Sequence, residues 1–348
     1  MATEHANTKI KYSFIKILQS SDLSHRRLPI MSMESSHSGP TVFLTGCTHG
    51  DEVSGMVIIQ EIFKAVKKIL VRGTIHAFPL LNPIGFEMAT RDIALSDEDL
   101  NRSFPGDPNG SLAERIADKI ITTIASKKPS IVLDLHNDWT KSIPYAFLDH
   151  APSIINSDAY KKSYELMDKT GLLPILDTEK VEGSLSYSLI SRGIPALTLE
   201  LGEPYVINEN NIEYGVKVIM NILEHLGMIE KRKESFVYLP TEPLKNKPLY
   251  FSHQVSSASG IIRFIAKPGD IVKKGHPIAR IYNAFGRHEE TVSAKNHGIV
   301  LGHSDFSVSY PGAPIMSFGI LEDGSAPPEE LALKIPAAVP NVIATPKK

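Results

Sequence analysis

Thr45-Gly46-Cys47-Thr48-His49-Gly50-Asp51-Glu52 joins two different sequence patterns. An apolar, β-branched run (Thr41–Leu44) precedes it, and an apolar stripe at helical spacing follows it from about Glu52 to Leu70. The stretch therefore predicts a turn from a strand into a helix. His49 and Glu52 lie three residues apart, so the start of that helix can turn both side chains to one side. An imidazole and a carboxylate placed in this way can bind one metal ion.

A second buried-type strand, Ile131–His136, ends on a histidine. Two histidines and one glutamate leave a fourth position open, which is the ligand set of a catalytic zinc site. Each signal is weak alone, because His–Glu pairs occur at many helix starts and a histidine at a strand end is more often purely structural. Asp134 lies on the same strand face as His136, so it either orients that imidazole or is an ordinary buried, hydrogen-bonded carboxylate.

Glu200 is an acidic residue in an otherwise apolar strand, Ile194–Leu201. A charged, buried and unpaired glutamate costs several kcal/mol, so this side chain either points into a polar cleft or has a raised pKa. Both properties suit a general base that takes a proton from a metal-activated water. An ion pair with Arg192 is the structural alternative, and Glu203 is the competing candidate for the base.

Residues 82–110 are rich in proline and glycine and predict a long loop. The segment contains Arg91, Asn101 and Arg102. An arginine fork beside an amide suits bidentate binding of a carboxylate. Most loop arginines are merely solvated, so the pattern indicates a substrate carboxylate site only in combination with the ligand set.

The composition of the whole chain excludes several classes of protein. The 348 residues carry a net charge of -2, which argues against a large nucleic-acid surface. Cys47 is the single cysteine, so no intrachain disulfide can form and a reducing, cytoplasmic location is expected. Met1–Lys11 lacks the apolar core of a signal peptide, and no apolar run approaches about 18 residues, so no membrane association is expected.

Strand and helix patterns alternate through residues 10–226. This alternation predicts an α/β fold with a mostly parallel or mixed central sheet and helices on both faces. Sites in such sheets gather at the carboxyl ends of the strands, so His49, His136 and Glu200 should converge.

The sequence also predicts the individual helices and strands. Ser111 and Glu114 have the spacing of a capping box at the start of a helix. Strands are expected at Tyr12–Gln19, Met31–Glu34, Thr41–Thr45, Thr74–Phe78, Ile131–His136, Tyr145–Leu148 and Ile194–Leu201, and helices at Glu52–Leu70, Ser111–Ser126, Ser157–Thr170, Leu185–Ser191 and Glu209–Leu226.

The composition changes near residue 230. We expect a catalytic domain over residues 1–230, a linker over 231–249, a small all-β sandwich over 250–322 and an extended tail over 323–348. Two half-repeats in the sandwich each contain a strand, a glycine turn and a second strand, which is typical of a two-fold β-sandwich. The first domain is expected to bind metal without the residues beyond 245.

Several motifs occur in a fixed order: Gly46–Glu52, Asn82–Gly85, Arg91, Asp99–Gly106, Asp134–His136 and Leu199–Glu200. Over roughly residues 40–205 they resemble the succinylglutamate desuccinylase/aspartoacylase family, a branch of the zinc carboxypeptidase-like fold. The resemblance implies one zinc ion (Zn2+) held by His49, Glu52 and His136, with Glu200 as the general base. It also implies that Arg91 helps to polarise the scissile carbonyl, and that Asn101 and Arg102 bind the α-carboxylate of the substrate.

The expected function is therefore zinc-dependent amidohydrolysis, the deacylation of a small N-acyl amino acid. The nearest alternative is a zinc carboxypeptidase acting on a peptide or cell-wall fragment, whose cleft would be open rather than capped by residues 250–320. A non-catalytic binding protein is a further alternative, although it would be expected to lose part of the ligand set.

The sequence decides neither whether the protein forms a homo-oligomer nor which acyl group the substrate carries. An acetyl group needs a small apolar pocket, whereas a succinyl or aspartyl group needs a further cation, for which Arg192, Lys141 and Lys180 are candidates.

The C-terminal half-repeats resemble the biotinyl/lipoyl-type β-sandwich of some larger members of this family. Carrier domains of that type have a modified lysine at the tip of a hairpin. The matching turn, Asn283–His288, contains no lysine, so no covalent cofactor is expected. The β-sandwich is expected to cap the cleft or to form an oligomer contact.

Overall fold

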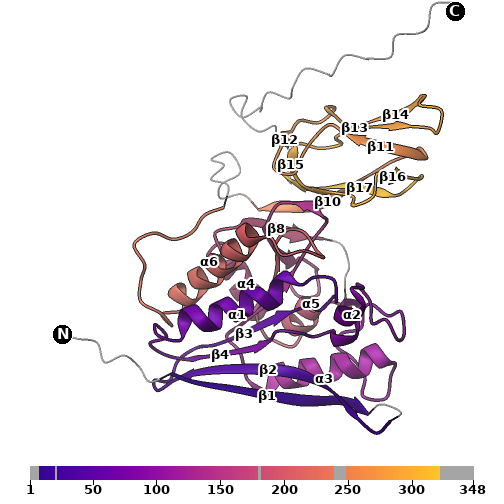
Figure 1. The fold of residues 1–348 in the computed structure, drawn as a ribbon. Helices are drawn as coiled ribbons and strands as arrows, with labels where there is room; N and C mark the ends of the chain where they lie inside the picture. The colour runs from indigo at the N-terminus through magenta and orange to yellow at the C-terminus, as the bar shows by residue number, and fades with distance from the viewer. Residues whose placement is uncertain (1–7, 20–21, 179–181, 239–247, 322–348) are drawn as a thin grey trace, which may run out of the picture.

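One mixed sheet extends through most of the molecule (Figure 1). The computed structural model describes residues 8–19, 22–178, 182–238 and 248–321. Neighbouring strands follow one another in the order β1 (Thr8–Gln19), β2 (His25–Ser35), β4 (Thr74–Phe78), β3 (Thr41–Gly46), β5 (Ile131–His136), β9 (Ala196–Glu200), β7 (Tyr145–Asp149), β8 (Leu173–Asp177), β10 (Leu249–Val255), β17 (Pro314–Ile320), β15 (Gly298–His303) and β12 (Ile271–Val272), and β6 (Lys141–Ser142) pairs with β15.

The centre of the sheet is parallel. Strand β3 pairs in parallel with β4 and β5, and β5 pairs in parallel with β9. Every residue of β5 is buried. The register places His136 opposite Glu200, at the carboxyl ends of β5 and β9. The predicted mixed α/β fold is confirmed, and its geometry gathers the ends of β3, β5 and β9 at one edge.

Helices cover both faces of this central part. On one face, Gly55 of α1 (Ser54–Val66) lies against Leu135 of β5, and α6 (Glu209–His225) packs on α1. On the other face, Thr198 of β9 donates a hydrogen bond to Ser186 of α5 (Leu185–Ile190). Helix α4 (Asp158–Met167) packs against β7 and β9, and α3 (Leu112–Ser126) packs against β1. Alternate residues of a strand point to opposite faces, so neighbouring residues of β5 contact different helices.

Several strands differ from the predictions. The antiparallel pair β1–β2 is longer than predicted, since pairing continues from Thr8 opposite Ser35 to Gln19 opposite His25. Strand β8 was not predicted, because Pro174 lies inside its apolar run and proline is rare in paired strands. Strand β8 nevertheless pairs in parallel with both β7 and β10.

The segment 82–110 is not the continuous loop that its composition predicts. It contains a short helix α2 (Pro83–Met88) and a 3-10 turn η1 (Leu100–Arg102). Asn82 accepts a hydrogen bond from the backbone N–H of Gly85, and Asp99 accepts one from that of Asn101. Such capping stabilises single helical turns, which show no apolar periodicity. The capping box of Ser111 and Glu114 at the start of α3 is confirmed.

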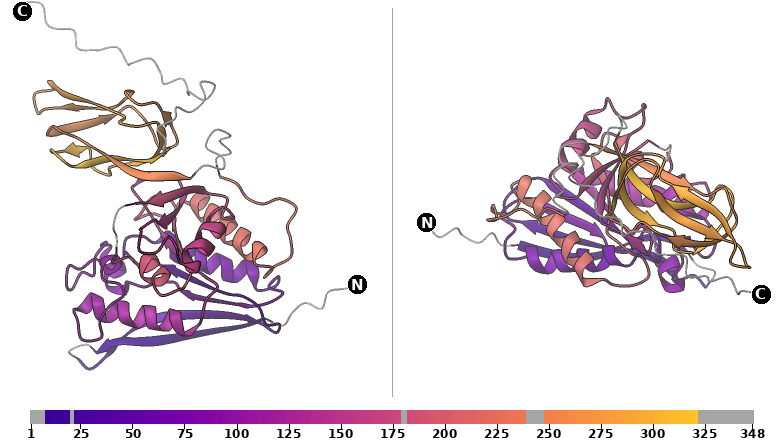
Figure 2. Two further views of the ribbon diagram at one scale, coloured as in Figure 1. Left: turned by 180° about the vertical axis from the view of Figure 1, so that it is seen from behind. Right: turned by 90° about the horizontal axis from the view of Figure 1, so that it is seen from above.

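The chain from β10 onward is all-β, as predicted, with no helix among residues 248–321. A second sheet has the order β14 (His288–Ser293), β13 (Pro277–Tyr282), β11 (Gly260–Phe264) and β16 (Val308–Ser309). These strands lie at one end of the α/β part (Figure 1 and the left view of Figure 2). The turn at Asn283–His288 joins β13 to β14.

The two parts share apolar packing. Ile143, Tyr145 and Ile175 of the α/β part form one buried cluster with residues of the β part, including Leu249 and Leu301. The boundaries near residues 230 and 250 stay a prediction. Residues 239–247 of the expected linker and the expected tail 323–348 lie outside the described residues. None of the helices in the described ranges is long and apolar enough to cross a membrane.

Candidate active site

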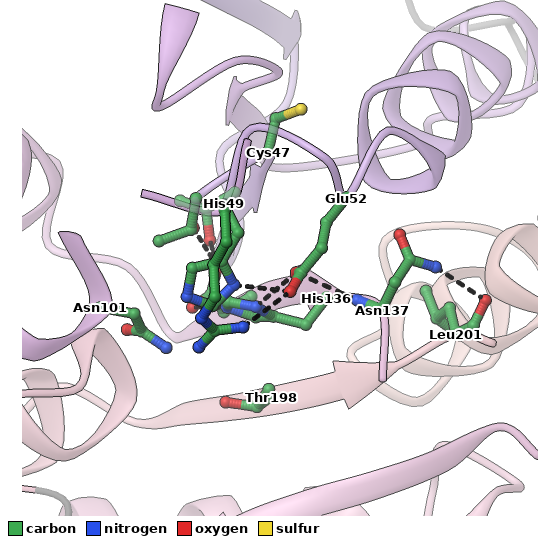
Figure 3. A network of polar contacts seen from close by, with 12 residues as sticks. Cys47, His49, Glu52, Asn101, His136, Asn137, Thr198 and Leu201 are labelled. Carbon is green, nitrogen blue, oxygen red and sulfur yellow. Dashed lines mark hydrogen bonds and ion pairs between the residues drawn. The ribbon is translucent and has the colours of Figure 1, made fainter. Parts of the chain in front are cut away.

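The structure brings His49, Glu52 and His136 together (Figure 3). His49 and Glu52 lie in the turn after β3, and His136 is the last residue of β5. One oxygen of Glu52 lies 2.6 Å from Nδ1 of His49, and the other lies 2.8 Å from Nδ1 of His136. All three residues are buried, and one donor atom from each lies within 4.8 Å of the others.

The helix expected to start near Glu52 begins two residues later. Helix α1 begins at Ser54, and Val53 is its N-cap. Both Glu52 and His49 therefore belong to the preceding turn, where the backbone rather than the helical repeat sets their directions. That turn packs tightly: a Cβ on Gly50 would lie 2.0 Å from the backbone carbon of Gly85, so only glycine fits.

Each histidine is held by a second carboxylate on its other ring nitrogen. Asp134 lies 2.8 Å from Nε2 of His136, and Asp99 lies 3.2 Å from Nε2 of His49. Carboxylates in this position fix the orientation of metal-binding histidines. Asp134 was one of the predicted partners. Asp99 was not, because it lies 50 residues from His49 and its role depends on how the segment 82–110 folds.

The electrostatics of the cluster favour charged groups. Burial opposes the ionised form of Glu52, but His49 and His136 hold the pKa of this carboxyl well below its usual range. Burial likewise opposes the imidazolium of His136, but Asp134 and Glu52 raise the pKa of His136 well above its ordinary value. An ionised carboxylate that faces the Nδ1 atoms of two histidines is a suitable set of donors for a divalent cation. The residues present therefore fit a metal ion.

Cys47 lies in the same turn but has a different environment, because burial raises the pKa of its thiol to about 12. This agrees with its interpretation as a small residue of the turn.

Glu200 lies beside this cluster at the end of β9. Burial raises the pKa of its carboxyl well above the ordinary value, and the neighbouring acids Asp138 and Glu52 act in the same direction. Its Oε2 is buried and has no hydrogen-bond partner among the described residues. Arg192 donates to the carbonyl of Ser188 and forms no ion pair with Glu200 in the described part of the chain.

Glu203 has a different environment from Glu200. Its two carboxylate oxygens accept hydrogen bonds from Asn208 at 2.8 Å and from Asn211 at 2.7 Å. Both oxygens are therefore engaged by neighbouring side chains, and Glu203 does not line the cavity described below. The geometry favours Glu200 over Glu203 as the group that can exchange a proton with a ligand.

The predicted polar residues of the segment 82–110 reach the same place. Arg91 donates to Asp99 and lies 3.6 Å from Glu52. The side-chain oxygen of Asn101 accepts from the backbone N–H of Leu185, which leaves its amide nitrogen able to donate (Figure 3). Arg102 is exposed and donates one hydrogen bond to the backbone carbonyl of Asn101.

All seven predicted site residues line one cavity of about 220 Å³. Sequence reasoning missed the remaining residues of its wall. Phe251 and His253 come from β10, so the β part of the chain contributes to the cavity. Their contribution depends on contacts between distant segments, and no local signal in the sequence marks it. The remaining lining residues are Asn137, Asp138, Tyr145, Phe147, Asp149, Asp177, Ser184, Ser186 and Thr198.

These features define the class of protein: an α/β enzyme with a candidate metal site in a small cavity. Residues 38–226 match the model of the succinylglutamate desuccinylase/aspartoacylase catalytic domain. The chain belongs to this family, as the sequence motifs predict. Family membership supports hydrolysis of an amide bond.

Individual relatives agree with this assignment. The N-alpha-acetyl-L-2,4-diaminobutyric acid deacetylase of Halomonas elongata is 28% identical over 288 residues, which cover 79% of this chain and 80% of that protein. The crystal structure of a succinylglutamate desuccinylase from Silicibacter sp. TM1040 superimposes with a TM-score of 0.75 at 20% identity, covering 92% of this chain and 97% of the other. The product-bound ectoine utilization protein EutE (DoeB) from Ruegeria pomeroyi also gives a TM-score of 0.75, at 21% identity and with 89% and 95% coverage. The two structures show the same fold.

Proposed function

We propose that this protein is a zinc-dependent amidohydrolase that deacylates a small N-acyl amino acid. The observation that carries the proposal is the buried His49–Glu52–His136 cluster, which opens onto the same cavity as Glu200. Two imidazoles and one carboxylate are the donor set that zinc hydrolases use when they keep one position open.

A zinc ion held by three protein ligands lowers the pKa of water to about 7 and polarises a carbonyl group. The protein side chains then have separate tasks. Glu200 accepts a proton from the attacking water and delivers it to the departing nitrogen. Its raised pKa suits this task, because a general base that must also act as an acid works best with a pKa near the working pH. Asp99 and Asp134 hold the two histidines in their orientations.

Two further groups are proposed to recognise the substrate. Arg91 lies close to Glu52 and can stabilise the oxyanion as charge develops on the scissile carbonyl. Asn101 and Arg102 line the cavity with an amide and a guanidinium, which together can bind the α-carboxylate. Arg102 is the more exposed of the pair, so the α-carboxylate would lie towards the outer end of the cavity.

The size and walls of the cavity support a small substrate. About 220 Å³ is below the usual range for drug-sized ligands, and Phe251 and His253 form part of the wall. The carboxypeptidase alternative requires an open cleft without this contribution from residues 250–320. The deacetylase relative acts on N-α-acetyl-L-2,4-diaminobutyric acid, an N-acyl amino acid, so that compound is the first substrate to test.

The test compares metal-free protein with protein supplied with one equivalent of zinc. Free amine is measured after incubation with N-acetyl, N-formyl and N-succinyl amino acids and with short peptides. We expect zinc-dependent release from at least one N-acyl amino acid and little release from peptides. Cleavage of peptides alone would favour the carboxypeptidase, and no zinc-dependent release from any compound would refute the proposal.

A further inference from the structure

One wall of the cavity carries three acidic residues, Asp138, Asp149 and Asp177, which we call the acidic wall. Asp149 ends β7 and Asp177 ends β8, and the two residues pair in the parallel register of these strands. Asp138 lies two residues after the end of β5. The carboxyl of Asp138 accepts a hydrogen bond from Tyr145 at 3.0 Å.

Asp149 is firmly positioned within the acidic wall. It is only 5% exposed, and both of its oxygens accept hydrogen bonds from hydroxyl groups, one from Ser184 and one from Ser186. Thr198 donates to Ser186 in turn. The serines belong to the N-terminal end of α5 and the threonine to β9, so two elements hold this carboxyl in place. A carboxylate oxygen with one hydrogen bond retains acceptor capacity for a ligand.

Aromatic rings stand next to the acidic wall. Phe147 and Phe251 both line the cavity, with ring centroids 5.1 Å apart and planes at 89°. Aromatic faces attract cations through their quadrupole. Carboxylates and aromatic rings therefore select the same kind of ligand group by two independent interactions.

Among the described residues that line the cavity, few cationic groups are left to bind a second carboxylate of the substrate, in addition to its α-carboxylate. Apart from histidines, they are the guanidinium groups of Arg91 and Arg102, and Arg91 is already bonded to Asp99. Neither Arg192 nor Lys141, the candidates for binding an acidic acyl group, lines the cavity. Lys180, the third candidate, lies outside the described residues.

We propose that the substrate of this enzyme is an N-acyl amino acid with a side-chain ammonium group, and that Asp149 binds this ammonium. The inference rests on the proposed function and adds the substrate class. Burial raises the pKa of Asp149 to about 6, so its carboxyl is mostly ionised at neutral pH, and an ammonium beside it favours that form. Arg102 also acts on Asp149, in the direction opposite to burial. A neutral side chain at the same place would bury this carboxylate further without adding a counter-charge of its own, which costs binding energy.

The experiment uses zinc-loaded full-length protein and a matched pair of substrates. N-α-acetyl-L-2,4-diaminobutyrate and N-acetyl-L-norvaline have side chains of nearly the same size, and only the first carries an ammonium. We expect the wild type to prefer the first in kcat/KM by about 100-fold, because a site built for a polar group rejects an apolar isostere strongly. N-acetyl-L-aspartate should be a worse substrate than either.

Asp149→Asn tests the residue. This variant should lose about 30-fold or more in kcat/KM with the diaminobutyrate substrate, while the norvaline substrate changes by less than about 3-fold. Asp158→Asn removes the same charge from an exposed position on α4 and should leave both values unchanged. Circular dichroism and zinc content show whether Asp149→Asn is folded.

The outcomes are distinguishable. Equal or better turnover of the norvaline or aspartate compound by the wild type overturns the inference and leaves the proposed function standing. Equal losses on both substrates in a folded Asp149→Asn variant remove Asp149 from ammonium binding. No turnover of any N-acyl amino acid by the wild type refutes the proposed function and the inference together. If Asp149→Asn does not fold, the wild-type preference among the three substrates decides the substrate class.

Discussion

Replacing Glu200 by glutamine separates proton transfer from the other properties of the site. Glutamine has nearly the same shape as glutamate, but it cannot accept and return a proton. Oε2 of Glu200 has no hydrogen-bond partner in the described part of the chain, so the substitution breaks no protein contact at that atom. His49, Glu52 and His136 keep their mutual contacts, so zinc binding should be retained.

The size of the effect follows from the role of the base. General acid–base catalysis contributes about 10²- to 10⁴-fold, which corresponds to about 3–5 kcal/mol of activation free energy. We therefore expect kcat to fall by that factor in Glu200→Gln with little change in KM. The raised pKa adds a stability effect of known sign in metal-free protein. The contribution of this carboxyl to stability should fall as the pH rises above 4.5, the ordinary pKa of a glutamate, because the folded state holds this proton more tightly than the unfolded state. The stability of the wild type relative to Glu200→Gln should therefore decrease as the pH rises through this range.

Glu203→Gln is the matched control. The two oxygens of Glu203 accept hydrogen bonds from Asn208 and Asn211, and one of these bonds is lost or reversed in the amide. The expected cost is about 1–3 kcal/mol of stability, seen as a lower melting temperature, with kcat unchanged. The assay is initial-rate release of amine by the zinc-loaded variants, together with zinc content and thermal melting. Retained activity in Glu200→Gln with loss of activity in a folded Glu203→Gln would refute the assignment of the base.

Three further changes test other parts of the account. Asp99→Asn should weaken zinc binding by about 10- to 100-fold in a chelator competition, because Asp99 holds both His49 and Arg91; an unchanged affinity would show that it does not orient the histidine. Arg102→Ala should raise KM by roughly tenfold for substrates with a free α-carboxylate and leave α-carboxamide analogues unaffected, whereas an equal effect on both would exclude Arg102 from carboxylate binding. Removing residues 248–348 should expose Ile143, Tyr145 and Ile175. Each large apolar side chain returned to water costs about 1.5–3 kcal/mol, so the melting temperature should fall and binding of a hydrophobic dye should increase. An unchanged melting temperature would show that the shared cluster adds little to stability.

The cluster of His49, Glu52 and His136 could be predicted because strand ends in a parallel sheet converge. His49 follows β3 and His136 ends β5, so the topology alone brings them to one edge. Glu200 stood out because it interrupts an apolar strand, and its burial and raised pKa agree with that signal. In each case a local run of apolar residues identified the strand. The parallel pairing of the strands in the sheet then brought residues that are distant in the sequence into contact.

The rest of the site depends on contacts that no local pattern encodes. Asp99 reaches His49 only because Asp99 caps a single 3-10 turn, which has no apolar periodicity. Phe251 reaches the cavity because β10 pairs with β8, a strand whose proline hid it from the sequence analysis. The hydroxyl groups around Asp149 come from α5 and the residue before it. Serine and threonine are common in such positions, so nothing marked them in advance.

The most direct test of the central claim is the zinc stoichiometry of the protein after dialysis, measured for the wild type and for Glu52→Ala. Glu52 faces both histidines, so its removal leaves two ligands that no longer share a carboxylate. We predict about one tightly bound zinc ion per chain in the wild type and a large loss of binding in the folded variant. A wild type without zinc, or a variant that retains its full zinc content, would contradict the claim that these three residues form the metal site.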